Sequence, residues 1–346
     1  MIGILGAAVP IVCVSPIREE AKGRLSMPLP VSLCMIVKNE ESNLGACLAC
    51  AADLVHEIIV VDTGSTDRTK DVASKHGAKI VDFAWIDDFA AARNESVRHA
   101  TGQWIFWLDA DDRIDQSSRA KLRSLFASLP EDNIGYAMTY HDGCSAVARI
   151  GLFRNHPEIR WTYRVHEQIL PSVERLGGRA EATGIIIHTV GYQYPEAVQS
   201  KLERNFRLLL LENSDRPGDP LTKWNLGRTT LRLGLYQEAA QWLQRCLARV
   251  GTSQPFFLPL AYGQLAEALC QMRRFREALE CCRAGRAKFP SDLPLLLAEG
   301  VVLAELGEPR EAELRLEEVV RRDPGNGLAR AWLARLRPLG RFEIGR

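Results

Sequence analysis

Short apolar runs alternate with amphipathic segments in the first half of the chain. Each run has the length and composition of a buried strand, and the runs are Val31 to Val37, Glu57 to Asp62, Ala78 to Phe83 and Trp104 to Asp109. The intervening segments, residues 43–54, 65–76 and 89–100, have helical periodicity, and glycine follows the last two. This alternation predicts an α/β domain with a mostly parallel sheet.

The pattern changes near residue 195, and beyond residue 200 it is wholly helical. Small residues recur there at Gly227, Ala266, Gly300 and Ala334, at intervals of 39, 34 and 34 residues. A period near 34 resembles tetratricopeptide repeats, in which helical hairpins stack into a superhelix. We therefore predict three parts: an N-terminal extension (residues 1–27), an α/β domain (28–195) and an all-α repeat domain of tetratricopeptide type (196–346).

The amino-acid composition limits the partners and the cellular location that we expect for the protein. The formal net charge is +1 and no basic patch stands out, which argues against a nucleic-acid partner. Nine cysteines are scattered through the predicted elements, and this pattern favours reduced thiols over a disulfide framework. We therefore expect a cytoplasmic protein, either dissolved in the cytoplasm or bound peripherally to the inner face of the membrane. The apolar residues 1–15 lack a basic start and contain Pro10, so we interpret them as an upstream start, with a weak signal peptide as the alternative.

Polar clusters follow three of the four predicted strands. They are residues 38–41 (Lys-Asn-Glu-Glu), 62–67 (Asp-Thr-Gly-Ser-Thr-Asp) and 109–112 (Asp-Ala-Asp-Asp). Because ligands bind beyond the carboxyl ends of parallel strands, the clusters predict a nucleotide site, with Ser65 or Thr66 capping a helix that faces phosphate. Side chains alternate along a strand, so we expect Asp109 and Asp111 to project from one side and offer hard oxygen ligands to a divalent cation.

The sequence around these clusters resembles that of family 2 glycosyltransferases, which have the GT-A (Rossmann-like) fold. The matching segments are residues 34–41, 57–67, 87–94 and 107–112. The resemblance implies that Asp109 and Asp111 bind Mn²⁺ or Mg²⁺ on a nucleotide-sugar diphosphate. The expected donor-binding residues are Asn39, Glu40, Asp62, Ser65, Arg93 and Asp109.

A second group of motifs lies on the acceptor side. Leu-Phe-Arg (152–154), Val-His-Glu (165–167) and His188 after an apolar run resemble a subgroup of the same family, although Tyr163 stands where glycine is more familiar. Transfer with inversion needs a base for the acceptor proton, and Glu167 is the first candidate, with Asp112 as the alternative. By its place in the chain, His188 is the expected third group at the metal or diphosphate.

The motifs and the family resemblance together predict a metal-dependent glycosyltransferase that moves a sugar from a nucleotide-diphosphate donor, a UDP-sugar. The resemblance alone implies that the transfer proceeds with inversion. The acceptor is a polypeptide, a glycan or a lipid-linked molecule, and the sequence does not choose among them. The alternative is a repeat-based scaffold whose sugar-nucleotide domain binds without turnover. The repeats either recruit a protein partner or the acceptor, mediate self-association, or buttress the first domain.

Overall fold

A computed structural model describes residues 30–130, 133–143, 145–190 and 195–336. The predicted extension, residues 1–27, lies outside this range. The chain separates into two compact units, and the boundary falls between Lys201 and Leu202. In the described ranges, no helix combines the length and the apolar character needed to cross a membrane.

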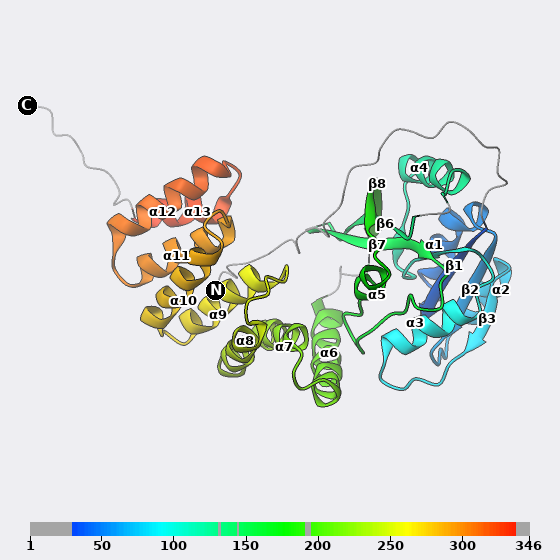
Figure 1. Ribbon diagram of the computed structural model, residues 1–346, viewed down its shortest axis with the longest axis horizontal. Coiled ribbons are helices and arrows are strands. Elements are labelled where there is room, and N and C mark those ends of the chain that lie inside the picture. The colour runs from blue at the N-terminus through cyan, green and yellow to red at the C-terminus, as the bar shows by residue number, and fades with distance from the viewer. Residues whose placement is uncertain (1–29, 131–132, 144, 191–194, 337–346) are drawn as a thin grey trace, which may run out of the picture. The chain divides into compact units, whose positions relative to one another are not determined.

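The first unit is built on an eight-stranded sheet of order β3-β2-β1-β4-β7-β6-β8-β5 (Figure 1). Neighbouring strands β3, β2, β1 and β4 are parallel, as the alternation of strands and helices predicts. The strands are β1 (Val31–Val37), β2 (Glu57–Asp62), β3 (Lys79–Asp82), β4 (Trp104–Trp107), β5 (Asp112–Arg113), β6 (Gly135–His141), β7 (Ala146–Arg154) and β8 (Ala180–Thr189).

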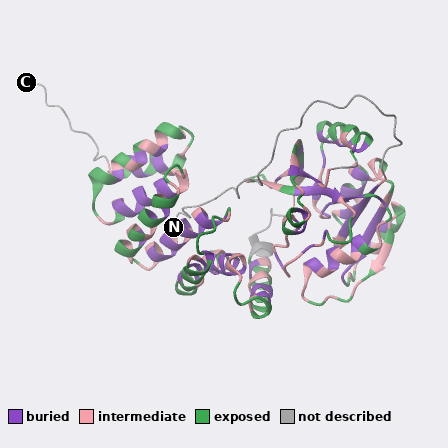
Figure 2. Ribbon diagram, in the orientation of Figure 1, coloured by how far each residue is buried: buried purple, intermediate pink, exposed green. Residues whose placement is uncertain are grey.

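Helices cover the parallel half of this sheet. Strand β1 is nearly all buried because it lies in the middle of the parallel strands, and Figure 2 shows the buried residues concentrated in the strands and the inner helix faces. The helical elements of the unit are α1 (Leu44–Ala51), the short 3₁₀ turn η1 (Ala52–Leu54), α2 (Thr69–Lys75), α3 (Phe89–Arg98), α4 (Gln116–Ala127) and α5 (Leu170–Arg175).

The second half of the sheet contains antiparallel pairs. Strand β7 runs antiparallel to both β4 and β6, and only residues 142–145 separate β6 from β7. So short a connection permits an antiparallel pair only, since a parallel pair needs a crossover of a dozen residues or more. The sheet thereby extends past β4. The Leu-Phe-Arg motif (152–154) lies along β4, and Arg154 is opposite Trp104 at the start of that strand.

The second unit consists of stacked helical hairpins. The helices are α6 (Pro195–Asp215, which spans the boundary), α7 (Pro220–Arg232), α8 (Tyr236–Val250), α9 (Leu258–Gln271), α10 (Phe275–Lys288), α11 (Leu293–Glu305), α12 (Pro309–Arg322) and α13 (Gly327–Leu336). The predicted small residues allow the helices to approach closely. A Cβ atom on Gly227 would lie 2.5 Å from Leu243 Cγ, and one on Gly300 would lie 2.9 Å from Leu316 Cγ.

Candidate functional site

The carboxyl ends of β1 and β2 are joined by reciprocal hydrogen bonds between the loops that follow them. The backbone N–H of Asn39 donates to Ser65 Oγ at 2.9 Å, and the N–H of Thr66 donates to Asn39 Oδ1 at 2.8 Å. Asn39 has a φ of 55°, a left-handed conformation that asparagine tolerates better than most residues. The structure therefore brings Asn39 and Ser65 together, and both shape the loops with their polar atoms.

Asp62 stabilises the loop that follows β2 by accepting hydrogen bonds from its backbone. It is 1% exposed, and its Oδ1 accepts hydrogen bonds from the N–H groups of Gly64 and Ser65 at 2.9 and 2.8 Å. Gly64 has a φ of 103°, which a side chain would strain. Among the described residues, Asp62 Oδ2 has no hydrogen-bond partner, so this buried acceptor is available to a donor group on a ligand.

The Asp-Ala-Asp-Asp segment forms a turn, and the prediction that its acids alternate along a strand is wrong. Strand β4 ends at Trp107, and the N–H of Asp112 donates to the carbonyl of Asp109 at 3.0 Å. Asp112 Oδ2 accepts from the Asp109 N–H at 2.9 Å, while Oδ1 accepts from Thr189 Oγ1 at 2.7 Å. The turn still places Asp109 and Asp111 at the end of β4.

Asp112 is built into this turn and is 1% exposed. Burial is the main cause that raises its pKa to about 7, and the charge of Asp109 adds to the rise. Since both of its oxygens already accept hydrogen bonds, the geometry does not support Asp112 as a base for the acceptor. Its contacts instead fix the position of the Asp109 backbone.

Three carboxylates repel one another at the edge formed by β1 and β4. Burial raises the pKa of Asp111, and the charge of Asp109 raises it further. Burial also raises the pKa of Glu40, and Asp111 and Asp109 act in the same direction, while Asn43 and Lys201 lower it. The charge of Asp109 thus raises the pKa of both Asp111 and Glu40, and a divalent cation would stabilise carboxylates placed in this way. The described residues nevertheless contain no preformed group of three metal-binding side chains.

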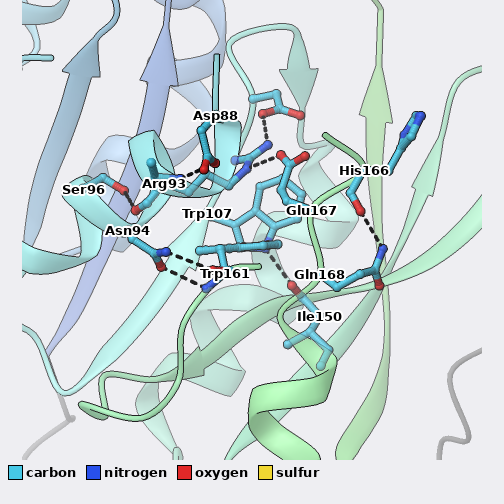
Figure 3. Close-up of polar contacts among 12 residues, drawn as sticks. Asp88, Arg93, Asn94, Ser96, Trp107, Ile150, Trp161, His166, Glu167 and Gln168 are labelled. Atoms are coloured by element: carbon cyan, nitrogen blue, oxygen red, sulfur yellow. Dashed lines mark hydrogen bonds and ion pairs between the residues drawn. The ribbon is translucent and has the colours of Figure 1, made fainter. Parts of the chain in front are cut away.

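Arg93 lies at the centre of the site, as Figure 3 shows. Its Nε donates to Glu167 Oε1 at 2.6 Å, and its Nη2 donates to Asp109 Oδ1 at 2.9 Å. The guanidinium is 4.5 Å from the ring centre of Trp107 and 5.2 Å from that of Trp161. Burial alone would lower the Arg93 pKa, but the charges of Asp109 and Glu167 raise it well above its ordinary value.

This environment changes the role expected for Arg93. The residue is 7% exposed, and its side chain joins two carboxylates instead of projecting into a donor pocket. The geometry therefore favours a positioning role and does not support direct contact with the donor. Its carboxylate partners are more accessible, because the Asp109 and Glu167 side chains are 34% and 14% exposed.

The loop that carries Glu167 is fixed by helix α3. Asn94 Nδ2 donates to the Trp161 carbonyl and the Trp161 N–H donates to Asn94 Oδ1, both at 2.9 Å (Figure 3). The Phe89 N–H donates to the carbonyl of Arg164 at 2.8 Å. Helix α3 thus supplies both the arginine that binds Glu167 and the asparagine that holds its loop.

The loop itself is a tight turn closed by a backbone bridge. The N–H of Thr162 donates to the Gln168 carbonyl at 3.0 Å, and the reverse bond is 2.9 Å. Tyr163 and His166 have φ values of 74° and 56°. Tyr163 therefore adopts a conformation that glycine takes without strain, at the position where the sequence departs from the familiar glycine.

His188 lies on β8 beside the site, and its side chain contacts another residue. His188 pairs with Arg113 in the sheet, and its Nε2 is 3.5 Å from Asp115 Oδ2. The structure does not unite His188 with Asp109 and Asp111 in one ligand set. The neighbouring Thr189, which binds Asp112, is a contact that no motif in the sequence indicated.

Three parts of the chain match known families. Residues 32–178 match the family described as Glycosyl transferase family 2, and residues 225–250 and 297–337 match two families of tetratricopeptide repeat. A TPR repeat-containing protein of Synechococcus elongatus is 36% identical over 241 residues, which cover 65% of this chain and 58% of that protein.

Further relatives carry glycosyltransferase names. Glycosyltransferase SunS of Bacillus phage SPbeta is 27% identical, over 63% of this chain and 53% of its own length. The lipopolysaccharide core biosynthesis glycosyltransferase LpsC of Rhizobium meliloti is 32% identical, over 30% of this chain and 39% of its own length. The chain thus spans little more than half the length of the most similar of these relatives.

Proposed function

We propose that this chain, whose residues 32–178 form a glycosyltransferase domain of family 2, moves a sugar from a nucleotide-diphosphate donor to an acceptor hydroxyl or other nucleophile. The observation that carries the proposal is the meeting of three strand ends: Glu40 after β1, Asp62 at the end of β2, and Asp109 with Asp111 after β4. The matching family and the glycosyltransferase relatives support the same activity.

The donor nucleoside occupies the edge formed by β1 and β2. Asp62 Oδ2, the buried acceptor without a partner, receives a hydrogen bond from the base, and Glu40 accepts from a second donor group of the nucleoside. Uracil, whose N3–H is a donor, is compatible with this acceptor-only carboxylate, and the resemblance to family 2 glycosyltransferases favours a UDP-sugar. Asn39 and Ser65 keep the two loops in register.

Asp109 and Asp111 hold a divalent cation, Mn²⁺ or Mg²⁺, against the diphosphate. When bound, the cation neutralises the charge that develops on the departing diphosphate. Asp109 Oδ1 is held by Arg93, so the side chain enters the site in one fixed orientation. His188 lies beside this site, and we propose that it contacts the diphosphate.

Glu167 is the base that removes the acceptor proton in an inverting transfer. The ion pair with the buried Arg93 fixes the orientation of the Glu167 carboxylate. Glu167 accepts the proton as the acceptor attacks the sugar. The acceptor is a glycan, a polypeptide or a lipid-linked molecule, and the helical repeats recruit it or a protein partner.

Donor binding gives the first test. We expect UDP to bind the parent more tightly with Mn²⁺ than with EDTA in titration calorimetry, and Asp111→Ala to lose this gain. Asp71→Ala, which removes an exposed acid of α2, is the matched control and keeps it. Equal UDP affinity with and without Mn²⁺ in the parent would refute the metal assignment.

Turnover separates an enzyme from the alternative of a non-catalytic scaffold. Glu167→Gln should lower the rate of sugar release from a UDP-sugar by at least about 100-fold, as expected for a lost base, while UDP affinity stays unchanged. Glu174→Gln on α5 is exposed and should have no effect. UDP binding by the parent with no release from any UDP-sugar would favour the scaffold.

A further inference from the structure

A basic cavity lies within the repeat unit, beside helices α6, α7 and α8. It has a volume of about 350 Å³, and the residues that give it its chemistry are Asn213, Pro217, Lys223, Trp242, Arg245 and Arg249. This volume is at the lower end of the range for sites that bind small ligands. Three of the six side chains are cationic, and none is acidic.

Lys223 is the buried cation of this cavity. The residue is 5% exposed, and its Nζ contacts two neutral acceptors, the Pro217 carbonyl and Asn213 Oδ1. Burial lowers the Lys223 pKa, and the charges of Arg249 and Arg245 lower it further. Asp219 acts in the opposite direction, but its Oδ2 already accepts the hydrogen bonds that cap α7.

Arg245 and Arg249 are exposed and lie one turn apart on α8, so their like charges repel each other. In the described part of the chain, neither arginine forms an ion pair with an acid. Arg245 instead lies over the ring of Trp242, with its guanidinium carbon 4.9 Å from the ring centre. No acidic side chain of the described ranges lines the cavity, and the carboxylate that acts on Lys223, that of Asp219, already accepts the hydrogen bonds that cap α7.

A second cluster of arginines in the same unit is neutralised by an acid of the chain itself. Arg283, Arg286 and Arg315 surround Glu299, which is 2% exposed and forms an ion pair with each of them. That cluster carries its own anion, whereas the cavity beside α8 does not. The difference indicates that the anion of the cavity comes from outside the chain.

We infer that the cavity of Lys223, Arg245 and Arg249 binds a phosphate group. Arginine offers planar, forked donors that match phosphate oxygens, and a buried lysine adds a point charge. A phosphate dianion also neutralises more of the three positive charges than a carboxylate does. This site lies within the repeat unit and is separate from the donor site proposed above.

Titration calorimetry of the full chain with inorganic phosphate in EDTA, at constant ionic strength, tests the site. We expect saturable binding of one phosphate, weakened at least about tenfold in Arg249→Gln, because one charge-assisted hydrogen bond of about 1.5 kcal/mol corresponds to that factor. Arg310→Gln, which removes an exposed arginine of α12, is the matched control and should bind like the parent. Equal affinity in the parent and Arg249→Gln would overturn the assignment.

A second variant keeps the test valid if Arg249→Gln is poorly folded. Lys223→Met retains the buried aliphatic stem and removes the charge, so it should fold and bind phosphate at least about tenfold more weakly. Glycerol 3-phosphate and O-phosphoserine distinguish a lipid-like from a peptide-like source of the phosphate. Acetate binding as tight as phosphate would show a general anion site and would overturn the proposal.

Discussion

Arg93 unites the two carboxylates on which the proposed chemistry depends. Its charge is nearly buried between two tryptophan rings, so removing it leaves Asp109 and Glu167 to repel each other across a partly buried space. The loss of one partner from a buried ion pair is far more costly than the loss of an exposed pair. Arg93 therefore determines both the stability and the geometry of the site.

We predict that Arg93→Met lowers the free energy of unfolding by about 3 kcal/mol and abolishes sugar transfer. Urea denaturation measures the first effect. Arg98→Met, on the same helix but with its side chain 65% exposed, is the control and should leave the free energy of unfolding nearly unchanged. Arg93→Lys preserves the charge but replaces the two nitrogens that each bind one carboxylate with a single ammonium, so full activity in this variant would contradict the positioning role.

Cys47 and Cys50 both lie on α1, but their sulfurs differ in chemistry. The side-chain interaction with Cys47 is the main cause that lowers the pKa of Cys50 to about 6, while burial raises the pKa of Cys34 to about 12. Cys50 Sγ lies 2.9 Å from the Cys47 carbonyl. The Cys47 thiol donates to the carbonyl of Asp109 at 3.3 Å, so this helix supports the turn that carries the proposed metal ligands.

Because the thiolate is the reactive form, Cys50 should react with iodoacetamide already at neutral pH. The rate should rise through about pH 6 and level off above it, since deprotonation is then complete. Peptide mass spectrometry after a short exposure at pH 5, 6, 7 and 8 measures this profile. Cys34 serves as the internal control and should stay unmodified. A Cys50 rate that keeps rising past pH 8 would contradict the lowered pKa.

At the scale of elements, the helix pairs of the repeat unit depend on glycines that admit a facing leucine. The Cβ of an alanine at position 227 would lie 2.5 Å from Leu243 Cγ, so the two helices must separate or Leu243 must leave its position. At position 218 an added Cβ meets no atom within 4 Å. The two glycines therefore offer a matched comparison in one unit.

We predict that Gly227→Ala lowers the free energy of unfolding by about 1–3 kcal/mol, the usual cost of overpacking. Gly218→Ala should change it by less than about 1 kcal/mol. Both values come from urea denaturation of the full chain. In a double-mutant cycle, Gly227→Ala should cost less in the Leu243→Ala background than in the parent, because the smaller side chain leaves room for the added Cβ. No difference between the two alanine variants would show that the helices are not closely packed at this point.

Over the whole molecule, the two units contain separate hydrophobic cores. The core of the first unit includes Trp104, Phe106 and Phe153, and that of the second includes Leu243, Ala278 and Leu295. Residues 32–178, which match the glycosyltransferase family, fall within the first unit. A chain that ends at Lys201 therefore retains every residue proposed for donor binding and catalysis.

We predict that this shortened chain folds, binds UDP with Mn²⁺ like the parent, and releases sugar from a UDP-sugar at a comparable rate. Transfer to the natural acceptor should be lost if the repeats recruit that acceptor. Calorimetry and a donor hydrolysis assay measure the first two properties. An insoluble or unfolded product would instead support the repeats as a buttress, and undiminished transfer to the natural acceptor would exclude recruitment.

The sequence alone determined the elements and their class. Periodicity indicated β1 to β4 and the helices between them, because a parallel strand buried on both faces leaves a continuous apolar run. It also indicated the repeat, because Gly227 and Gly300 recur where helices must approach. The strand ends that carry Glu40, Asp62 and Asp109 followed from topology, since parallel strands end at one edge.

Only the tertiary structure decided how the side chains are used. Asp112 and Arg93 occur in motifs that suggest catalysis or donor binding. Packing instead buries Asp112 in a turn, where both of its oxygens accept hydrogen bonds, and places Arg93 beside two tryptophan rings. Thr189 and Glu167 reach their partners across 77 and 74 residues of chain. Local periodicity contains no information on such pairs, because hydrogen bonds and burial depend on which distant segments meet.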